Sequence, residues 1–302
     1  FLANWFRDAG LKVGLLSRGY KSLTHDTNPK RERGAEDRSP SLTLRVSDAN
    51  DEKLLLDQFC PGVPHWQNPD RCASAKQAVG EGGCELLILD DGFQHRGLHR
   101  DLDIVLIDAL NPWGYGHCLP RGLLREPVRA IGRADLVLMT RADLATTDEL
   151  TAIRTVLARH QHVGSVIDVS FQPTALINSA VQTRPLTDLA GQRCLGFCGV
   201  GNPESFEQTL RRLGADVVEF HAFPDHHHYS DGDLALLAER AATTSANWLL
   251  TTRKDLVKLP SMDIGCRPLW AVDIGTQILR GAHLLEHRMW MVLESARRGG
   301  HD

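Results

Sequence analysis

The sequence has 302 residues, of which 42% are hydrophobic and 24% charged, and its net charge is −4 at pH 7. This length can bury the core of one large domain or of two medium ones. The charge balance gives no general reason to expect a nucleic-acid partner, and no apolar run approaches the roughly 18 residues of a membrane span. The seven cysteines lack metal-ligand spacing, so we expect free thiols in a reducing compartment and no disulfide partner.

The first ten residues, FLANWFRDAG, have the pattern of an amphipathic helix. Leu2, Trp5 and Phe6 are spaced i, i+3 and i+4, and Gly10 follows at the position of a C-terminal cap. The chain begins at Phe1 without a methionine, as if in the middle of a longer segment. We therefore expect a fragment whose natural N-terminus lies upstream.

Six short apolar runs recur along the chain, each followed by a polar turn and most by a helical pattern. They cover residues 12–20, 85–91, 103–109, 134–143, 193–203 and 247–255. Continuous apolar runs of about five to seven residues are typical of strands buried on both faces, as in a parallel sheet covered by helices. Polar residues follow these runs, and open α/β sheets bind ligands at the carboxyl ends of their strands. The sequence thus predicts an α/β fold with a mainly parallel sheet.

The connecting segments indicate how the chain is divided. Residues 21–40 are charged and aperiodic, as expected of a surface loop, whereas residues 111–127 form a long loop of the kind that is usually functional or disordered. A helix is expected over 143–162, and two extended segments over 165–179 lead to a second lobe. We predict a catalytic domain over 1–170, an α/β lobe over 175–280 and a C-terminal helix over 281–302.

One apolar run ends in two adjacent acids, Asp90 and Asp91, followed by Gly92. A strand that ends in acids resembles a Walker B element, whose carboxylate holds the Mg²⁺ of a nucleotide directly or through water. Asp-Gly is also common turn chemistry, so the acids alone leave both interpretations open. Gln94 and His95 in the same turn favour a functional site.

Asp51 and Glu52 stand at the start of a helical pattern. Acids at a helix N-terminus are favourable for capping and for the helix dipole alone. An unpaired aspartate near a phosphate site could instead take the proton from an acceptor alcohol. The pattern by itself favours the capping interpretation.

The segment FPDHHH contains Asp225 followed by the histidines His226, His227 and His228. Consecutive ligands do not converge easily on a tetrahedral metal, and no distant partner has suitable spacing. The Asp-His pair at a turn is better suited to catalysis or to substrate contact than to zinc.

Two further motifs follow strands, TRAD at 140–143 and TRKD at 252–255, and they loosely resemble the base-reading loop of GTP-binding proteins. The segment 197–206, FCGVGNPESF, lacks the third glycine of a dinucleotide fingerprint. It predicts a tight strand-to-helix turn in which Asn202 or Pro203 opens the helix.

Taken together and in order, the motifs resemble the tetraacyldisaccharide 4′-kinases, the lipid A kinases of Gram-negative bacteria. The matching segments are LLSRGY (15–20), NDEKLLL (50–56), LDDGFQHRGLHRDLDIVLIDA (89–109), LPRGLLREP (119–127), ADLVLMTRAD (134–143), FCGVGNPESF (197–206), AFPDHHHYS (222–230) and LLTTRKDLVKLP (249–260). The resemblance implies a P-loop-type, doubly wound α/β fold with a smaller second α/β lobe. It also implies transfer of the γ-phosphoryl group of ATP, with Mg²⁺, to the 4′-hydroxyl of a lipid A disaccharide precursor. The implied location is the cytoplasmic face of the bacterial inner membrane, reached peripherally through an anchor outside this chain.

The resemblance also implies roles for individual residues. Asp51 would be the catalytic base, with Glu52 beside it at the substrate, and His226 would support Asp51 across the cleft between the lobes. The nucleotide side would be formed by two acids that hold Mg²⁺ and by two polar neighbours, namely Asp90, Asp91, Gln94 and His95. Phosphate groups of the lipid or the nucleotide would be contacted by guanidinium groups, which match such oxygens well; the expected residues are Arg71, Arg121 and Arg125.

The sequence departs from the family pattern in two places. No G-x-x-x-x-G-K-[ST] motif occurs in it, so we expect the phosphate-binding loop just upstream of Phe1 and little activity from the fragment alone. The box around the expected base reads Asn50-Asp51-Glu52-Lys53, with Asn in place of Gly and Lys in place of Pro. Two other functions stay open: a GTP-binding regulatory module built on TRAD or TRKD, and a catalytically inactive interaction domain of the same fold.

Overall fold

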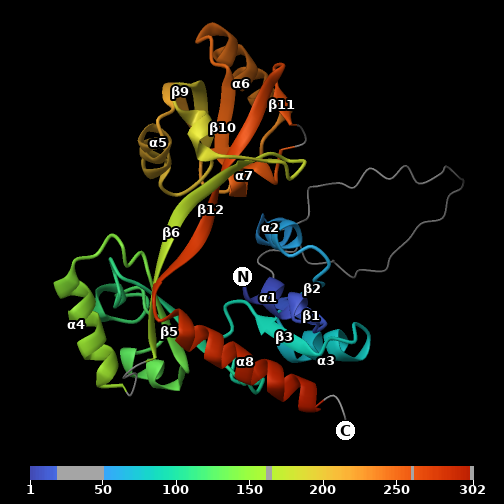
Figure 1. Ribbon diagram of the computed structural model, residues 1–302, viewed down its shortest axis with the longest axis vertical. Coiled ribbons are helices and arrows are strands. Elements are labelled where there is room, and N and C mark those ends of the chain that lie inside the picture. The colour runs from blue at the N-terminus through green and yellow to red at the C-terminus, as the bar shows by residue number, and fades with distance from the viewer. Residues whose placement is uncertain (19–50, 161–164, 260–261, 300–302) are drawn as a thin grey trace, which may run out of the picture.

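The protein forms two β-sheets covered by helices (Figure 1). The structure, a computed structural model, describes residues 1–18, 51–160, 165–259 and 262–299. The predicted surface loop at 21–40 lies outside the described residues, as do the last two residues of the predicted run 12–20. None of the helices in the described ranges has the length and hydropathy that a membrane span requires.

The smaller sheet has three parallel strands in the order β2-β1-β3. Its central strand β1 (Val13–Ser17) is buried along its whole length and lies between β2 (His65–Gln67) and β3 (Leu86–Leu89). Helices of the same part of the chain are α1 (Leu2–Asp8), α2 (Asp51–Phe59) and α3 (Arg71–Gly80). The predicted amphipathic start is thus a helix, and Gly10 follows it with φ +95°, a left-handed conformation that favours glycine.

The larger sheet has nine strands and a main path of seven, β4-β5-β6-β12-β10-β8-β9. In chain order the strands of this sheet are β4 (Ile104–Asp108), β5 (Leu136–Thr140), β6 (Val166–Ile177), β7 (Thr183–Arg184), β8 (Arg193–Cys198), β9 (Asp216–Ala222), β10 (Trp248–Thr252), β11 (Asp263–Ile264) and β12 (Arg267–Arg280). Every neighbouring pair on the main path is parallel except β6 and β12, which run antiparallel. The predicted mainly parallel α/β fold is confirmed.

The long strands β6 and β12 join two lobes (Figure 1). The first lobe holds the smaller sheet with β4 and β5, and the second lobe holds β8 to β11. The start of β6 pairs with β5, and its end pairs with the start of β12, which in turn pairs with β10. The two extended segments predicted over 165–179 are therefore largely one strand, running from the first lobe into the second. The predicted boundaries near 170 and 175 fall inside this strand, and the division of the chain into domains stays a prediction.

The remaining helices cover the larger sheet or connect its strands. They are α4 (Thr147–Ala158), α5 (Pro203–Arg212), α6 (Asp231–Thr243), α7 (Arg253–Leu256) and α8 (Ala282–Gly299), with the short 3-10 helices η2 (Gly114–Gly116), η3 (Val128–Arg133) and η4 (Leu186–Leu189). Asn202 caps α5 by accepting a hydrogen bond from the Ser205 N–H, and Pro203 is its first residue, as predicted. Capping boxes open α4 at Thr146 and α6 at Ser230.

The C-terminal helix α8 returns from the second lobe to the core of the first. Its Leu285, Met289 and Leu293 are buried in one cluster with Phe6 of α1 and the strands of both sheets. Each such side chain contributes roughly 1.5–3 kcal/mol by leaving water. The two sheets are thus held together through the first and last helices of the chain.

Two of the free cysteines lie inside β8. Cys194 and Cys198 are free and buried, and burial raises the pKa of the first to about 12 and of the second to about 11. A thiol reacts with alkylating agents as the thiolate, which these two groups do not form near neutrality.

We therefore expect iodoacetamide at about pH 8.5 to label the exposed Cys266 in the native protein and to spare Cys194 and Cys198 until a denaturant is added. Mass spectrometry of the tryptic peptides measures the labelling. Equal labelling of all three cysteines without denaturant would contradict the packing of β8.

Candidate active site

The centre of the site is the sharp turn that follows β3. The Asp90 N–H donates to the carbonyl of Leu16 on β1 at 2.8 Å, which extends the sheet pairing into the turn. Asp91 then adopts the left-handed region with φ +50°, and a Cβ on Gly92 would lie 2.6 Å from the Cβ of Leu89. Only glycine fits at that position, so the backbone turns away at once and leaves the carboxylates of both acids exposed.

Two arginines predicted to contact phosphate hold this turn. Arg71, the first residue of α3, is only 5% exposed and donates from Nη2 to the carbonyl of Asp90 at 3.2 Å. Arg125, from the long loop 111–127, donates from Nη1 to both carboxylate oxygens of Asp91, at 2.6 Å for Oδ1. Arg71 thus supports the turn from inside, while Arg125 balances its charge from outside.

The Asp91–Arg125 ion pair is open to solvent, with 45% and 53% of the two side chains exposed. Exposed ion pairs contribute at most about 1 kcal/mol, since water screens them. Either partner can therefore exchange its contact for a phosphate or a cation at little cost. The third predicted arginine, Arg121, is exposed on the same loop.

Gln94 and His95 point in different directions. The Gln94 side chain lies beside Glu126, whose pKa is held below its usual range by hydrogen bonds from Arg133 and, to a smaller extent, from Gln94. The His95 ring lies against α3, with Nε2 3.7 Å from the Cys72 Sγ. Gln94 therefore lines the site, whereas His95 packs behind it.

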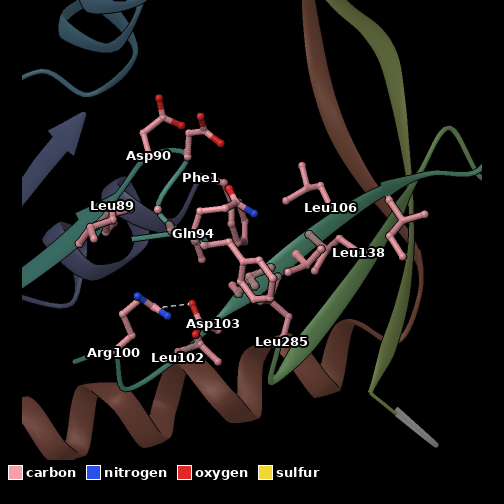
Figure 2. A pocket seen from close by; sticks show the side chains of 18 of the residues that line it. Phe1, Leu89, Asp90, Gln94, Arg100, Leu102, Asp103, Leu106, Leu138 and Leu285 are labelled. Carbon is pink, nitrogen blue, oxygen red and sulfur yellow. Dashed lines mark hydrogen bonds and ion pairs between the residues drawn. The ribbon is translucent and has the colours of Figure 1, made fainter. Parts of the chain in front are cut away.

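A cavity of about 1410 Å³ opens beside the turn, between β3 and β4 (Figure 2). Its wall includes the polar residues Asp90, Asp91, Gln94 and Arg125, the charged Arg100 and Asp103, and apolar residues of α1, β3, β4 and α8. Figure 2 shows Leu89 of β3 and Leu106 of β4 on opposite sides of it. Within the described ranges β3 pairs only with β1 and β4 only with β5, so both strands present an edge to this space.

The FPDHHH segment forms a second turn, in the second lobe. His226 has φ +60°, and its backbone N–H donates to the carbonyl of Gly199 at 3.2 Å. Its ring Nε2 lies 3.3 Å from Nζ of Lys254, which also lies 3.0 Å from the carboxylate of Asp225. The hydrogen bond from Lys254 lowers the pKa of Asp225.

The three histidines differ in their surroundings. His227 stacks on Phe223 with ring centroids 4.6 Å apart, and its Nε2 lies 3.2 Å from the Asp233 carboxylate. His228 is exposed. His226 is the one held at a strained backbone position beside charged groups, a conformation that costs roughly 1–3 kcal/mol and often marks a functional site.

The helix α2 lies between the two lobes in Figure 1. Its Phe59 ring has the Arg253 guanidinium of α7 over it, 3.5 Å from the ring centroid. Asp51 and Glu52 are the first two residues of α2, but their side chains lie outside the described residues. The start of α2 therefore belongs to a helix that contacts the second lobe.

The structure thus brings Asp90, Asp91, Gln94 and Arg125 together at one cavity, supported by Arg71. His226 lies in the other lobe, and no contact between it and Asp90 is present in the described part of the chain. Lys254, beside His226, was missed because its motif was considered only for its loose resemblance to a base-reading loop. Lys254 follows β10, and β8 and β10 are adjacent parallel strands, so the turns after their carboxyl ends meet. This pairing is the signal that could have identified Lys254 as a site residue.

The acidic turn suits one kind of metal ion. Mg²⁺ in nucleotide sites is typically held by one or two carboxylates, with water and phosphate oxygens completing its coordination. Asp90 and Asp91 supply such a pair on a rigid strand end. Among the described residues no cluster of three or more His, Cys, Asp or Glu side chains is placed to hold a metal, so a cage made by protein alone is not formed there.

A mainly parallel α/β sheet with acids and an arginine gathered after one strand is typical of nucleotide-dependent phosphotransferases of the P-loop type. The chain matches the family model of LpxK, tetraacyldisaccharide-1-P 4′-kinase, over residues 1–293. The chain belongs to this family, as its motifs predicted, and is an ATP-dependent kinase of lipid A biosynthesis.

Individual relatives agree with the family match. The tetraacyldisaccharide 4′-kinase of Anaeromyxobacter dehalogenans (strain 2CP-C) is 41% identical over 92% of this chain and 72% of its own length. That of Syntrophus aciditrophicus (strain SB) is 38% identical over 99% of this chain and 79% of its own length. The crystal structure of LpxK from Aquifex aeolicus in complex with ATP superposes with a TM-score of 0.68 at 29% identity, covering 97% of this chain and 82% of that one.

Proposed function

We propose that the site transfers the γ-phosphoryl group of ATP to the 4′-hydroxyl of a tetraacyldisaccharide 1-phosphate at the Asp90–Asp91 turn. The observation that carries this proposal is the pair of exposed acids on a rigid strand end, balanced by an arginine whose ion pair is weak enough to exchange. Transfer of a phosphoryl group needs positioning and charge neutralisation more than covalent help. This turn offers both.

On this proposal the chain's own residues divide the work. Asp51, at the start of α2, takes the proton of the 4′-hydroxyl as its oxygen bonds to the γ-phosphorus, and the bond from phosphorus to the leaving ADP oxygen breaks. His226 supports Asp51 from the second lobe, and Glu52 contacts the acceptor. Arg125 shifts from Asp91 to a phosphate oxygen.

The remaining predicted residues complete the phosphate side. Asp90 and Asp91 would hold Mg²⁺, which when bound neutralises charge on the transferring phosphate. Gln94 and His95 line or support the same turn. Arg121 and Arg71 contact phosphates of the lipid or the nucleotide, and Arg71 also keeps the turn in place.

We also propose where the reaction takes place. An acceptor with several acyl chains is held by a membrane, and ATP is supplied from the cytoplasm. The chain would therefore work peripherally at the cytoplasmic face of the inner membrane, with no nucleic acid as a partner. Vesicles that carry the acceptor should bind the full-length protein, whereas vesicles of neutral lipid alone should bind it more weakly.

The alternative of a GTP-binding module receives less support from the two motifs that suggested it. In TRAD, Asp143 accepts a hydrogen bond from Gln172 at 2.8 Å. In TRKD, Asp255 is fully buried and accepts from the Gly199 N–H at 3.0 Å. The buried Asp255 is therefore not placed to select a guanine base, whereas the exposed Asp143 keeps one hydrogen bond within the protein.

The experiment is a transfer assay on the full-length protein with γ-labelled ATP, Mg²⁺ and the disaccharide acceptor, with NMR of the product to locate the phosphate. We expect the 4′-phosphate. Asp51→Ala should slow turnover by about 10²- to 10⁴-fold, the usual contribution of a general base. His226→Ala should also slow it, and the matched control His228→Ala should not.

Undiminished turnover in Asp51→Ala would remove that residue from the base role. Equal rates for the two histidine variants would remove the supporting role of His226. If no phosphate is transferred but guanine nucleotides bind selectively, the chain is a GTP-binding module; if neither occurs, it is an inactive domain of this fold.

A further inference from the structure

We propose that Lys254 is a positioning residue, which fixes the ring tautomer and the direction of His226 from the one-turn helix α7. The inference rests on the proposed function in one respect, since His226 matters for turnover only if it takes part in the transfer. The contacts of α7 itself do not depend on that assumption.

The helix α7 is anchored by a buried acid. Asp255 is fully buried, and its Oδ2 accepts hydrogen bonds from the Thr252 hydroxyl at 2.7 Å and from the Gly199 N–H at 3.0 Å. Lys258, whose side chain is 4% exposed, lies 3.5 Å from Oδ1. These contacts tie α7 to the ends of both β8 and β10, because Gly199 follows β8 and Thr252 ends β10.

The same anchor fixes the backbone of the histidine turn. Gly199 donates its N–H to Asp255, and its carbonyl accepts a hydrogen bond from the His226 N–H at 3.2 Å. Lys254 then completes the arrangement through side chains, with Nζ 3.0 Å from Asp225 Oδ1 and 3.3 Å from His226 Nε2. Asp255 of α7 therefore holds the backbone of this turn, and Lys254, the residue before it, holds its side chains.

The hydrogen-bond donors of the Lys254 ammonium determine the tautomer of the His226 imidazole. An ammonium group has three donors and no acceptor, so its hydrogen bond to Nε2 requires a lone pair there. The ring proton must then reside on Nδ1. His226 is thereby held in the tautomer that donates from Nδ1, which is the nitrogen that can support a carboxylate.

Arg253, the residue before Lys254, connects α7 to the first lobe. Arg253 donates to Asp273 at 2.7 Å, and its guanidinium covers the ring of Phe59 in α2. The helix that begins at Asp51 and the turn that carries His226 are therefore both in contact with neighbouring residues of α7. This places Lys254 where it can set His226 relative to α2.

The test compares Lys254→Met and Lys254→Arg with the matched control Lys76→Met, an exposed lysine of α3. The first measurement is the ¹⁵N spectrum of the histidine rings, which distinguishes protonated from unprotonated ring nitrogens without any need for turnover. We expect His226 of the unaltered protein and of Lys76→Met to carry its proton on Nδ1. Lys254→Met should lose that signature, and Lys254→Arg should restore most of it.

The second measurement is kcat and KM for phosphoryl transfer. Lys254→Met should lower kcat by about 10- to 100-fold, the factor expected for one charge-assisted hydrogen bond, with KM little changed. In a His226→Ala background the same change should have no further effect.

An unchanged His226 tautomer in Lys254→Met overturns the inference, whatever the rate. A rate loss that persists in the His226→Ala background overturns it too, because Lys254 would then act by another route. Failure of the proposed function looks different: the unaltered protein and Lys76→Met would transfer no phosphate, while the spectra would still report the tautomer.

Discussion

Asp90→Asn is expected to reduce phosphoryl transfer by about 10²- to 10³-fold, the loss typical of removing one group that stabilises developing charge. The side chain is exposed at the end of β3, and no hydrogen bond from the described residues reaches its carboxylate. Its charge therefore contributes little to folding and is directed to the cavity. Asn keeps the shape of the Asp90 side chain and removes its charge, so we expect a lower kcat in the presence of Mg²⁺.

The control is Asp148→Asn, an equal change of charge on the exposed start of α4. Both variants should have the melting temperature of the unaltered protein to within a degree or two, because neither acid is buried. Steady-state kinetics over a range of Mg²⁺ concentrations measure the effect. If Asp90→Asn and Asp148→Asn turn over at the same rate, the acid at the end of β3 is part of a turn and nothing more.

Asp255→Ala is expected to have the largest effect on folding. It removes about 3–5 kcal/mol from the free energy of unfolding, because it breaks a buried pair and leaves the buried Lys258 ammonium without its carboxylate partner. It also leaves the Gly199 N–H and the Thr252 hydroxyl without their acceptor. Urea denaturation followed by circular dichroism measures the loss.

The double variant Asp255→Leu with Lys258→Met tests the reason for that loss. When both charges are replaced by apolar groups of similar size, much of the lost stability should return. The histidine turn would still lack its anchor at Gly199, so activity should stay low. A loss of less than about 1 kcal/mol in Asp255→Ala would show that the buried pair does not hold α7.

The strands could be predicted because their signal is local. The runs that became β1, β3, β4, β5, β8 and β10 are short, apolar and followed by turns, and each lies where the periodicity indicated. The acids after β3 could be identified for the same reason, since a strand end and its turn are neighbours in sequence. Asn202 and Pro203 likewise predict the start of α5, because the cap and the first helical residue are adjacent in sequence.

What could not be predicted depends on contacts between distant segments. Arg71 is predicted to contact phosphate, yet no local pattern indicates that it is buried at the start of α3 and donates to the carbonyl of Asp90, 19 residues further on. Asp255 looked like a base-reading acid, yet its partner Gly199 is 56 residues away. The length of β6 follows from its pairing with β12, about a hundred residues further on, which no local pattern contains.

The most direct test of the acidic turn is a change of metal preference in Asp90→Cys. A thiolate is a poor ligand for Mg²⁺ and a good one for softer ions such as Zn²⁺ or Cd²⁺. If Asp90 binds the metal of the nucleotide, this variant should be nearly inactive with Mg²⁺ and should regain a substantial part of its rate with a softer ion, whereas Asp148→Cys should prefer Mg²⁺ as the unaltered protein does. Full activity of Asp90→Cys with Mg²⁺, or no recovery with any softer ion, would contradict the assignment of this turn as the metal-nucleotide end of the kinase site.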